Sequence, residues 1–234
     1  MTQFTAFSGD FARRQITLFG DFTTDASPFA YNTSAALGTA TQSNETANAL
    51  GNAVLGISSG TSAGVFPYSG IYMAPAVSAG SAVDTTYRLG NGSIEVSARG
   101  RVSSSSVATH VVSVGISSCN RDTNVRPGLD FVGFFCLGNA LVWSIAVINN
   151  GNVVSFPTTA TVDTTKVLRV VVDAKASISE FYIDGMLVRK IETPIRTSVG
   201  MVPCAEIKDC VSGGSNANGA LSVDYFIVQQ QVNR

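Results

Sequence analysis

The chain has 234 residues, a mass of 24.4 kDa and a formal net charge of −1, and charged residues make up 13% of it. This length suits one large all-β domain, and the near-neutral charge argues against nucleic acid or an anionic membrane as a partner. No apolar run reaches the roughly 18–20 residues of a membrane-spanning helix, and the first residues lack the apolar stretch of a signal peptide.

Residues 1–49 predict an N-terminal strand followed by a loop-rich segment. Ile16–Phe22 is apolar enough for a first strand, whereas Thr24–Asn48 is rich in Thr, Ala, Ser and Asn and poor in large apolar residues. Two interpretations of Thr24–Asn48 stay open: a surface loop, or an extended arm that packs on the sandwich or on a neighbouring subunit. Residues 50–234 then form the sandwich, and the chain is a single globular domain overall.

Two tyrosines are the candidates for contact with a glycan. Phe66–Pro75 carries Tyr68 and Tyr72 among Pro and Gly residues, which predicts a loop that exposes aromatic rings. Apolar alternation predicts further strands elsewhere, at Leu50–Ile57, Tyr87–Val102 (with a turn at Asn91-Gly92), Val107–Ser117, Thr197–Ile207 and Leu221–Gln231. No convincing helix is found.

A polar loop at residues 120–128 is the candidate metal site. Asn120, Asp122 and Asn124 alternate side-chain oxygens, which are the ligands that calcium prefers. The loop lacks the glycine and the final glutamate of a helix–loop–helix calcium site, so a plain polar turn is the competing interpretation. We therefore expect no cofactor, with calcium as the one ion to test.

Residues 131–156 predict a three-stranded meander with turns at Gly138-Asn139 and Asn150-Gly151. Its first hairpin is apolar on both faces, which places these strands in the middle of the assembly. One face then belongs to the main core, and the other to a second buried layer such as a subunit contact. The two predicted faces are Phe134, Cys136, Leu141 and Trp143, and Phe131, Phe135, Val142 and Ala146.

The clearest local prediction is a strand followed by a hairpin at residues 167–191. Val167–Ala174 alternates with Leu168, Val170, Val172 and Ala174 on one apolar face. Asp184-Gly185 then lies between two apolar runs, which is a strong signal for a type I′ turn. With this turn, the predicted pairs are Ile183–Met186, Tyr182–Leu187, Phe181–Val188 and Glu180–Arg189, and the predicted core side chains are Phe181, Ile183, Met186 and Val188.

These residues also carry a resemblance. LRVVVDA, a short link and FYIDGMLV resemble the late strands of the concanavalin A-like lectin/glucanase jelly rolls, which include laminin G-like modules. The last predicted strand, LSVDYFIVQQQ, resembles the closing strand of that superfamily. The likeness extends over Tyr87–Gln231 and implies an all-β, antiparallel β-sandwich of jelly-roll type. The superfamily contains lectins, glucanases, adhesion modules and viral surface proteins, so it implies a fold more than a function.

No catalytic set is found, and we expect a protein that is not an enzyme. Retaining glucanases of the resembling superfamily need two carboxylates roughly 5–5.5 Å apart. Glu95 is the only carboxylate on its strand, and Asp184 is taken by the turn, so it cannot serve Glu180 as a partner. The single histidine, His110, starts a strand, and no nucleophile elbow is present to make a triad with it.

Four cysteines complete the candidate residues. Cys136 lies in the apolar meander and is predicted to be a buried free thiol. Cys204 and Cys210 bracket five residues and could close a small disulfide loop, although reduced thiols are expected without a signal peptide.

Two functional hypotheses follow, with a third behind them. The first is a non-enzymatic structural or interaction protein of a bacteriophage particle, such as a capsid decoration, fibre or tail-associated protein, with glycan-binding capacity. Its partners would be further copies of the chain, other virion proteins and host-surface polysaccharide. It would be made in the host cytoplasm and would reach the virion without a signal peptide. The alternative is a stand-alone lectin-like carbohydrate-binding module, and a glycoside hydrolase comes third.

Overall fold

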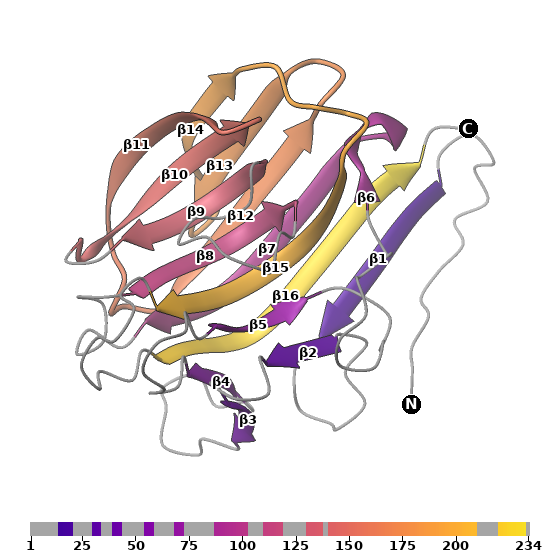
Figure 1. The fold of residues 1–234 in the computed structure, drawn as a ribbon. Helices are drawn as coiled ribbons and strands as arrows, with labels where there is room; N and C mark the ends of the chain where they lie inside the picture. The colour runs from indigo at the N-terminus through magenta and orange to yellow at the C-terminus, as the bar shows by residue number, and fades with distance from the viewer. Residues whose placement is uncertain are drawn as a thin grey trace.

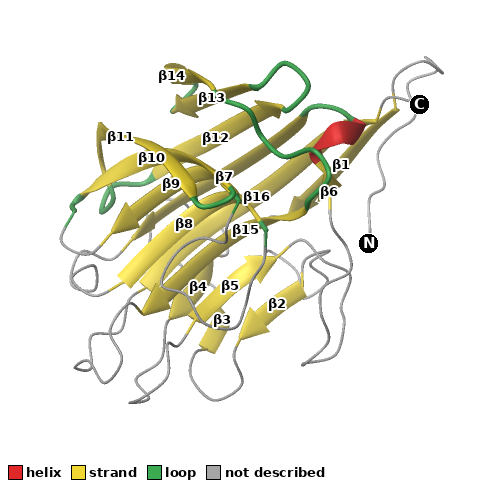
Figure 2. Cartoon of the chain, turned by 45° about the horizontal axis from the view of Figure 1, so that its top comes forward, coloured by secondary structure: helices red, strands yellow, loops and turns green. Residues whose placement is uncertain are grey.

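The computed structural model describes residues 14–20, 30–33, 39–43, 54–58, 68–72, 87–102, 110–118, 130–137, 140–209 and 220–232. Across these ranges sixteen strands form two antiparallel sheets, which face each other as a jelly-roll β-sandwich (Figure 1). The one helical turn is the short 3-10 helix η1, Leu89–Asn91 (Figure 2). Within the described ranges no helix has the length and hydropathy to cross a membrane. The all-β prediction is confirmed.

Sheet A has the strand order β14-β13-β12-β7-β16-β4-β3. Its longest strand, β16, pairs with β4 near its start and with β1 over its second half. The strands of sheet A are β1 (Arg14–Gly20), β3 (Thr39–Ser43), β4 (Val54–Ser58), β7 (Ile94–Val102), β12 (Lys166–Asp173), β13 (Ile178–Ile183), β14 (Met186–Glu192) and β16 (Ala220–Val232).

Sheet B has the order β11-β10-β9-β8-β15-β5-β2, and β6 pairs with the first residues of β15. The strands of sheet B are β2 (Ala30–Thr33), β5 (Tyr68–Tyr72), β6 (Tyr87–Arg88), β8 (His110–Ser117), β9 (Phe131–Leu137), β10 (Val142–Asn149), β11 (Asn152–Thr161) and β15 (Gly200–Asp209).

The main core fills the space between the sheets, because every second residue of each central strand points inward. Leu168, Val170 and Val172 of β12 are buried in it, as their alternation predicts. Phe134 of β9 meets Phe181 of β13 across the sandwich with ring centroids 5.7 Å apart and an interplanar angle of 85°. Such edge-to-face contacts between large buried rings contribute strongly to the cohesion of a core.

The Asp184-Gly185 turn is confirmed, since both residues have positive φ, at 50° and 82°. Asp184 Oδ1 accepts the Val167 amide at 2.9 Å, and Lys166 Nζ donates to Oδ2 at 3.0 Å. Asn150-Gly151 makes the second predicted turn, with φ of 49° and 80°. Each of these turns joins two neighbouring strands, β13–β14 and β10–β11.

The predicted register of the β13–β14 hairpin is wrong beyond its first two pairs. A bulge at Val188 places Arg189 opposite Phe181 and Lys190 opposite Glu180. Phe181 and Ile183 are core residues as predicted, but Met186 is 72% exposed and Val188 is 41% exposed. The displaced Arg189 stacks its guanidinium 3.9 Å from the Phe156 ring centroid, which links β14 to β11.

The strand–turn–strand predicted over Tyr87–Val102 is found as β6, the helical turn η1 and β7, and this turn carries the chain from sheet B to sheet A. Two further expectations need correction. Thr24–Asn48 is not loop throughout, because it contains β2 and β3, which pair with β5 and β4. Leu141 is exposed rather than buried.

The two-faced meander is otherwise found as predicted. Phe134, Cys136 and Trp143 lie in the main core, whereas Phe131 and Ala146 are buried on the opposite face of sheet B. Ile148 joins this second cluster and Phe135 packs against it. Gly138-Asn139 lies outside the described residues.

A glycine pair at the centre of sheet B generates a stability prediction. Gly115 and Gly133 are cross-strand partners, and a Cβ at Gly133 would lie 2.4 Å from the Val114 carbonyl oxygen. We expect Gly133→Ala to lower the free energy of unfolding by about 3 kcal/mol, because the clash is with backbone that cannot give way. Gly185→Ala is the control, since it has positive φ but nothing within 4 Å of the new Cβ, and should cost about 1 kcal/mol. Urea unfolding measures both, and equal losses would contradict the packing described.

Candidate functional site

The outer face of sheet B, meaning the face turned away from the core, holds the most unusual combination of residues in the described chain. Two cross-strand rows define its centre. The first row runs Cys204, Gly115, Gly133 and Ala146, and the second runs Glu206, Ser113, Phe135 and Ser144. A floor of small residues is thus bordered by aromatic and hydroxyl side chains.

Phe131 completes this floor. A Cβ on Gly133 would lie 2.8 Å from Phe131 Cζ, so the aromatic ring extends over the glycine. Phe131 is buried, and Phe135, four residues further along the same face of β9, is half-buried. The glycine is therefore required twice, by the neighbouring backbone and by the ring above it.

Glu206 is the polar residue at the base of the face. It is 2% exposed, and its Oε1 accepts a hydrogen bond from the Ser113 hydroxyl at 2.9 Å. A buried carboxylate needs such partners to offset its lost hydration. Along the outer face of sheet B, among the side chains that the structure describes, Glu206 is the one carboxylate.

Exposure on this face increases toward β11. Ser144 of β10 is half-buried, and its neighbour Pro157 on β11 is exposed. Ser155, the cross-strand partner of Ala146, is exposed as well. The open part of the face therefore offers a half-buried phenyl ring at Phe135, a proline ring and two hydroxyl groups.

The structure places Tyr68 and Tyr72 in β5, a strand rather than the predicted loop. Position 72 is opposite Cys204 and position 68 is opposite Lys208, so both positions have the register of the outer-face rows that contain Cys204 and Glu206. The register thus brings the two candidate glycan contacts into the same sheet as Phe135 and Glu206. It does so through β15, which lies between β5 and β8.

The other predicted site residues are not brought together by the described chain. Asn120, Asp122 and Asn124 lie outside the described residues, as does Cys210. Cys204 is buried on β15. The calcium site and the Cys204–Cys210 disulfide therefore stay predictions. Among the described residues, no group of three or more His, Cys, Asp or Glu could hold a metal ion.

Cys136 is a buried free thiol, as predicted. Its Sγ donates to the Ala140 carbonyl oxygen at 2.7 Å, and burial raises the pKa of the thiol to about 11. The thiolate form is therefore suppressed near neutral pH, which suits a packing residue rather than a nucleophile.

An ion pair missed by the sequence analysis holds one end of this sheet. Asp130, directly before β9, is buried and accepts hydrogen bonds from Arg196 Nε at 2.8 Å and from the Asn150 amide at 3.0 Å. Arg196 Nη2 also donates to the second carboxylate oxygen. Burial by itself would raise the pKa of Asp130. The hydrogen bonds from Arg196, Asn150 and Ser118, together with the guanidinium charge, lower it by more, so the pKa of Asp130 lies below the ordinary value of 3.8.

Sequence comparison adds no family, since no family model and no curated protein matches the chain. Solved structures do match. A prokaryotic β-1,3-1,4-glucanase (lichenase) from a mouse hindgut metagenome is similar with a TM-score of 0.59 and 11% identity, over 91% of this chain and 98% of that one. A carbohydrate esterase of the Shiga toxin-encoding bacteriophage phi24B has a TM-score of 0.56 and 13% identity, over 93% and 98%.

The binding domain of botulinum neurotoxin DC also matches, with a TM-score of 0.52 and 10% identity, over 86% of this chain and 43% of that one. At such identities the likeness concerns the fold alone. The chain is therefore a jelly-roll β-sandwich, a fold that it shares with the glucanase, the phage esterase and the toxin binding domain.

The Asp130 ion pair generates a pH prediction. Because the folded pKa is depressed, the carboxylate stabilises the fold above its ordinary value of 3.8 and loses this effect as the pH falls through the lower folded value. We expect Asp130→Asn to lower the free energy of unfolding by about 2 kcal/mol at pH 7, since it leaves Arg196 without its counter-charge.

Urea titrations at a series of pH values measure this difference, which should shrink as the pH falls toward 3. Asp163→Asn, at an exposed carboxylate, is the matched control and should change little at any pH. If Asp130→Asn lowers the free energy of unfolding by the same amount at every pH, the charge-based account is contradicted.

Proposed function

We propose that this chain is a non-enzymatic interaction protein of a bacteriophage particle, and that it binds glycans on the outer face of sheet B. The observation that carries the proposal is the composition of that face. Above a buried base of glycine, alanine and one carboxylate, Glu206, it presents the half-buried Phe135 and Ser144 and the exposed Ser155 and Pro157.

This composition suits binding for a physical reason. Sugar rings present flat faces of C–H groups that pack against aromatic and other apolar side chains, and hydroxyl groups that exchange hydrogen bonds with Ser and Thr. Gly115, Gly133 and Ala146 are buried, so they form the base beneath the accessible groups and are not themselves contacts for a ligand. Ser144, Ser155 and Pro157 extend the same surface toward the open edge at β11.

Hydrolysis of a glycosidic bond makes a different demand. It requires two carboxyl groups on either side of the bond, about 5–5.5 Å apart for retention or 6.5–9.5 Å apart for inversion. On the described outer face, Glu206 has no second carboxylate beside it and is already bonded to Ser113. These facts support a face that holds a glycan without cutting it.

The proposed role in a phage particle draws on two lines of support. One solved structure of the same fold is a bacteriophage protein, described as a carbohydrate esterase, and it aligns over nearly its whole length. The chain also has few charges and many small residues, in keeping with a rigid, repeatedly packed sandwich. Host-surface polysaccharide is the ligand class that such a particle would meet.

Binding to a glycan array that contains bacterial surface polysaccharides and β-1,3-1,4-glucan is the direct test of this function. For the oligosaccharide that binds, calorimetry with Phe135→Ala and with Tyr72→Ala should each show about tenfold weaker affinity, because each substitution removes an aromatic contact. Tyr225→Ala, on the outer face of sheet A, should leave the affinity unchanged.

Thermal melting should accompany each variant, so that a loss of folding is not taken for a loss of binding. If no glycan binds the wild-type chain, or if all three variants weaken binding equally, the proposed site is wrong. If reducing ends accumulate from a bound polysaccharide, the non-enzymatic assignment is wrong and the glycoside hydrolase hypothesis takes its place.

A further inference from the structure

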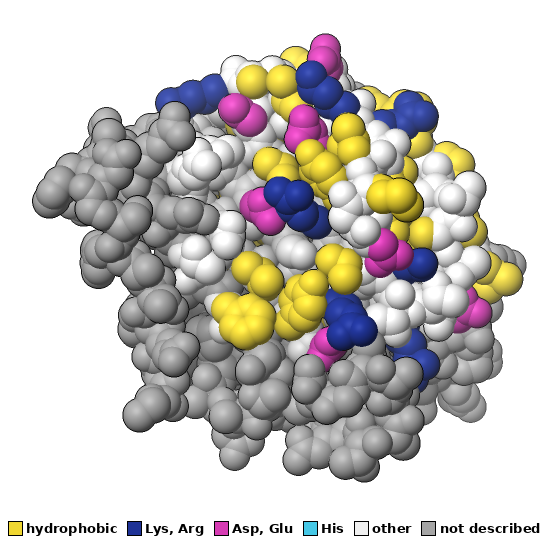
Figure 3. Space-filling model, turned by 180° about the vertical axis from the view of Figure 1, so that it is seen from behind, with side chains coloured by type: hydrophobic (Ala, Val, Ile, Leu, Met, Phe, Trp, Pro, Cys, Tyr) yellow, Lys and Arg dark blue, Asp and Glu magenta, His cyan; other side chains and the backbone are white. Residues whose placement is uncertain are grey.

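The outer face of sheet A differs in chemistry from that of sheet B and is not used by the proposed function. Figure 3 shows it as a surface on which hydrophobic side chains alternate with charges of both signs. One cross-strand row crosses the whole face, and the register aligns its members from β14 to β1. This central row consists of Leu187, Tyr182, Arg169, Ser97, Ile227 and Phe19.

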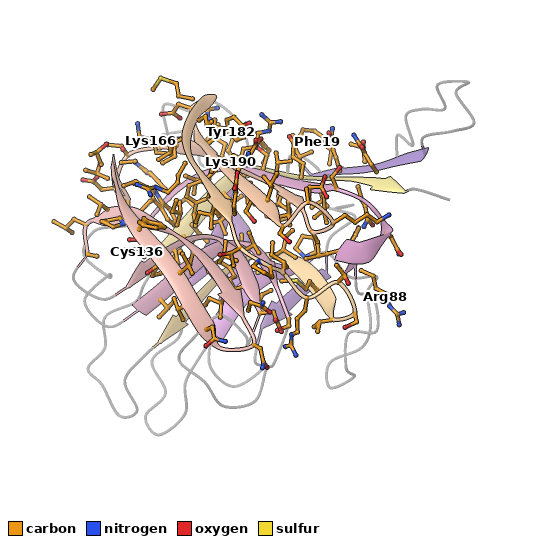
Figure 4. All side chains as sticks on the ribbon, turned by 90° about the horizontal axis from the view of Figure 1, so that it is seen from above. Phe19, Arg88, Cys136, Lys166, Tyr182 and Lys190 are labelled. Atoms are coloured by element: carbon orange, nitrogen blue, oxygen red, sulfur yellow. The ribbon has the colours of Figure 1, made fainter. Side chains whose placement is uncertain are left out.

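Both ends of the central row are exposed and apolar. Phe19 is 51% exposed and packs its ring 6.4 Å from that of Tyr225, while Leu187 is 54% exposed beside Met186. In Figure 4, Phe19 and Tyr182 lie along the same side of the molecule, away from Cys136. Apolar side chains gathered in this way mark a surface that gains free energy when it is covered.

The charges between these ends are neutralised within the face itself. Arg169 donates to both oxygens of Glu95, at 2.7 and 2.8 Å, and its guanidinium lies 4.7 Å from the centre of the Tyr182 ring. Arg99 donates to Asp224 at 2.8 Å. Ion pairs that already satisfy each other cost less to bury than single charges, so they do not prevent a partner from covering the face.

We infer that the outer face of sheet A is the contact between two copies of this chain, related by a two-fold axis that lies along the central row. Such an axis lays each strand over the same strand of the second copy, running in the opposite direction. The row on one side of the central row therefore faces the row on its other side in the second copy. On β7 the row of Arg99 then lies over the row of Glu95 from the other copy, so the Arg99–Asp224 pair of each copy faces the Glu95–Arg169 pair of the other and no unpaired charge is buried.

The axis exchanges positions on the neighbouring strands in the same way. On β13 Glu180 meets the acidic Asp184 of the turn, whose charge is already paired with Lys166 Nζ at 3.0 Å. Val171 and Val167 flank the central row on β12, so each valine meets the other one of the second copy. On β16 the exchanged residues are Tyr225 and Gln229. Arg169 lies on the axis with its charge already paired to Glu95, so the axis does not bring two unpaired cations together. A polyanion is a poorer match, because the face carries acidic as well as basic groups.

The size of the face also suits a dimer. Six strands about 4.8 Å apart, crossed by the nine residues of β7 at about 3.3 Å each, give a face of roughly 800 Å². This is about the area that one partner buries in a stable protein–protein interface of standard size. The outer face of sheet B stays free in both copies, so the dimer would present two glycan-binding faces on opposite sides.

Cross-linking tests the axis directly, because a residue on a two-fold axis meets its own copy. Because stacked sheets lie about 10 Å apart, too far for a direct disulfide, we expect Ile227→Cys to form a covalent dimer with a short bifunctional thiol cross-linker. Val153→Cys, which is exposed on sheet B, should give no more covalent dimer than the wild type treated in the same way. Light scattering of the wild-type chain should give twice the monomer mass of 24.4 kDa at micromolar concentration.

Substitution of the exposed ends gives the second test. Phe19→Glu and Leu187→Glu should each raise the dissociation constant at least tenfold, and Val153→Glu should leave it unchanged. A monomeric wild type at 100 µM would overturn the inference, as would a dimer that Val153→Glu weakens and Phe19→Glu does not. Failure here would leave glycan binding on sheet B unaffected, so the two proposals are tested separately.

Discussion

The inner faces of the two sheets meet through large side chains, and this contact is the constraint on which the rest of the structure depends. Phe134 and Phe181 meet edge to face across it, and Trp143 is fully buried nearby in the same core. Because successive side chains of a strand point to opposite faces, the two neighbours of each core residue lie on an outer face. The chemistry of both outer faces is therefore carried by the alternate positions of the same strands.

Strand β9 shows this division of roles most clearly. Val132, Phe134 and Cys136 belong to the core, whereas Phe131, Gly133 and Phe135 belong to the outer face of sheet B. A carboxylate is absent from the described outer positions of this strand, and the glycine is held there by the close approach of β8. The result is a flat apolar surface, with the one acidic group of the described face, Glu206, buried two strands away on β15.

The ends of the sandwich are held by a different kind of contact. Asp130 joins the start of β9 to the β10–β11 turn through Asn150 and to the segment before β15 through Arg196. Arg189 stacks on Phe156 and joins the β14 edge of one sheet to the β11 edge of the other. The Arg189–Phe156 contact thus ties the two sheets together at one edge, whereas the Asp130 contacts hold one end of sheet B.

The local part of this fold was predictable from the sequence, because it depends on signals a few residues apart. The alternation of Val167–Ala174 and the two turns at Asn150-Gly151 and Asp184-Gly185 need only strand periodicity and positive φ. The bulge at Val188 was missed because an extra residue leaves the apolar run unchanged in appearance, so Val188 was placed opposite Phe181 in the core.

The site was less predictable, because its partners are far apart in the sequence. Glu206 and Ser113 are separated by 93 positions, and Arg196 and Asp130 by 66. Glu206 follows Val202 and Cys204 at a spacing of two residues, and this spacing was the signal in the sequence that it lies on the same buried face. Tyr68 and Tyr72 stay candidates for a glycan contact, and their place in β5 depends on pairing with β15, which no local pattern reveals.

Hydrogen–deuterium exchange of the intact chain, with and without a bound oligosaccharide, tests the central claim most directly. The account predicts slower exchange of amides in β9, β10 and β11 on binding, with no change in β7, β12 and β13 and no cleavage of the oligosaccharide. Protection confined to β7, β12 and β13 would place the ligand on the opposite sheet and contradict the account. Cleavage of the oligosaccharide during the experiment would contradict it as well.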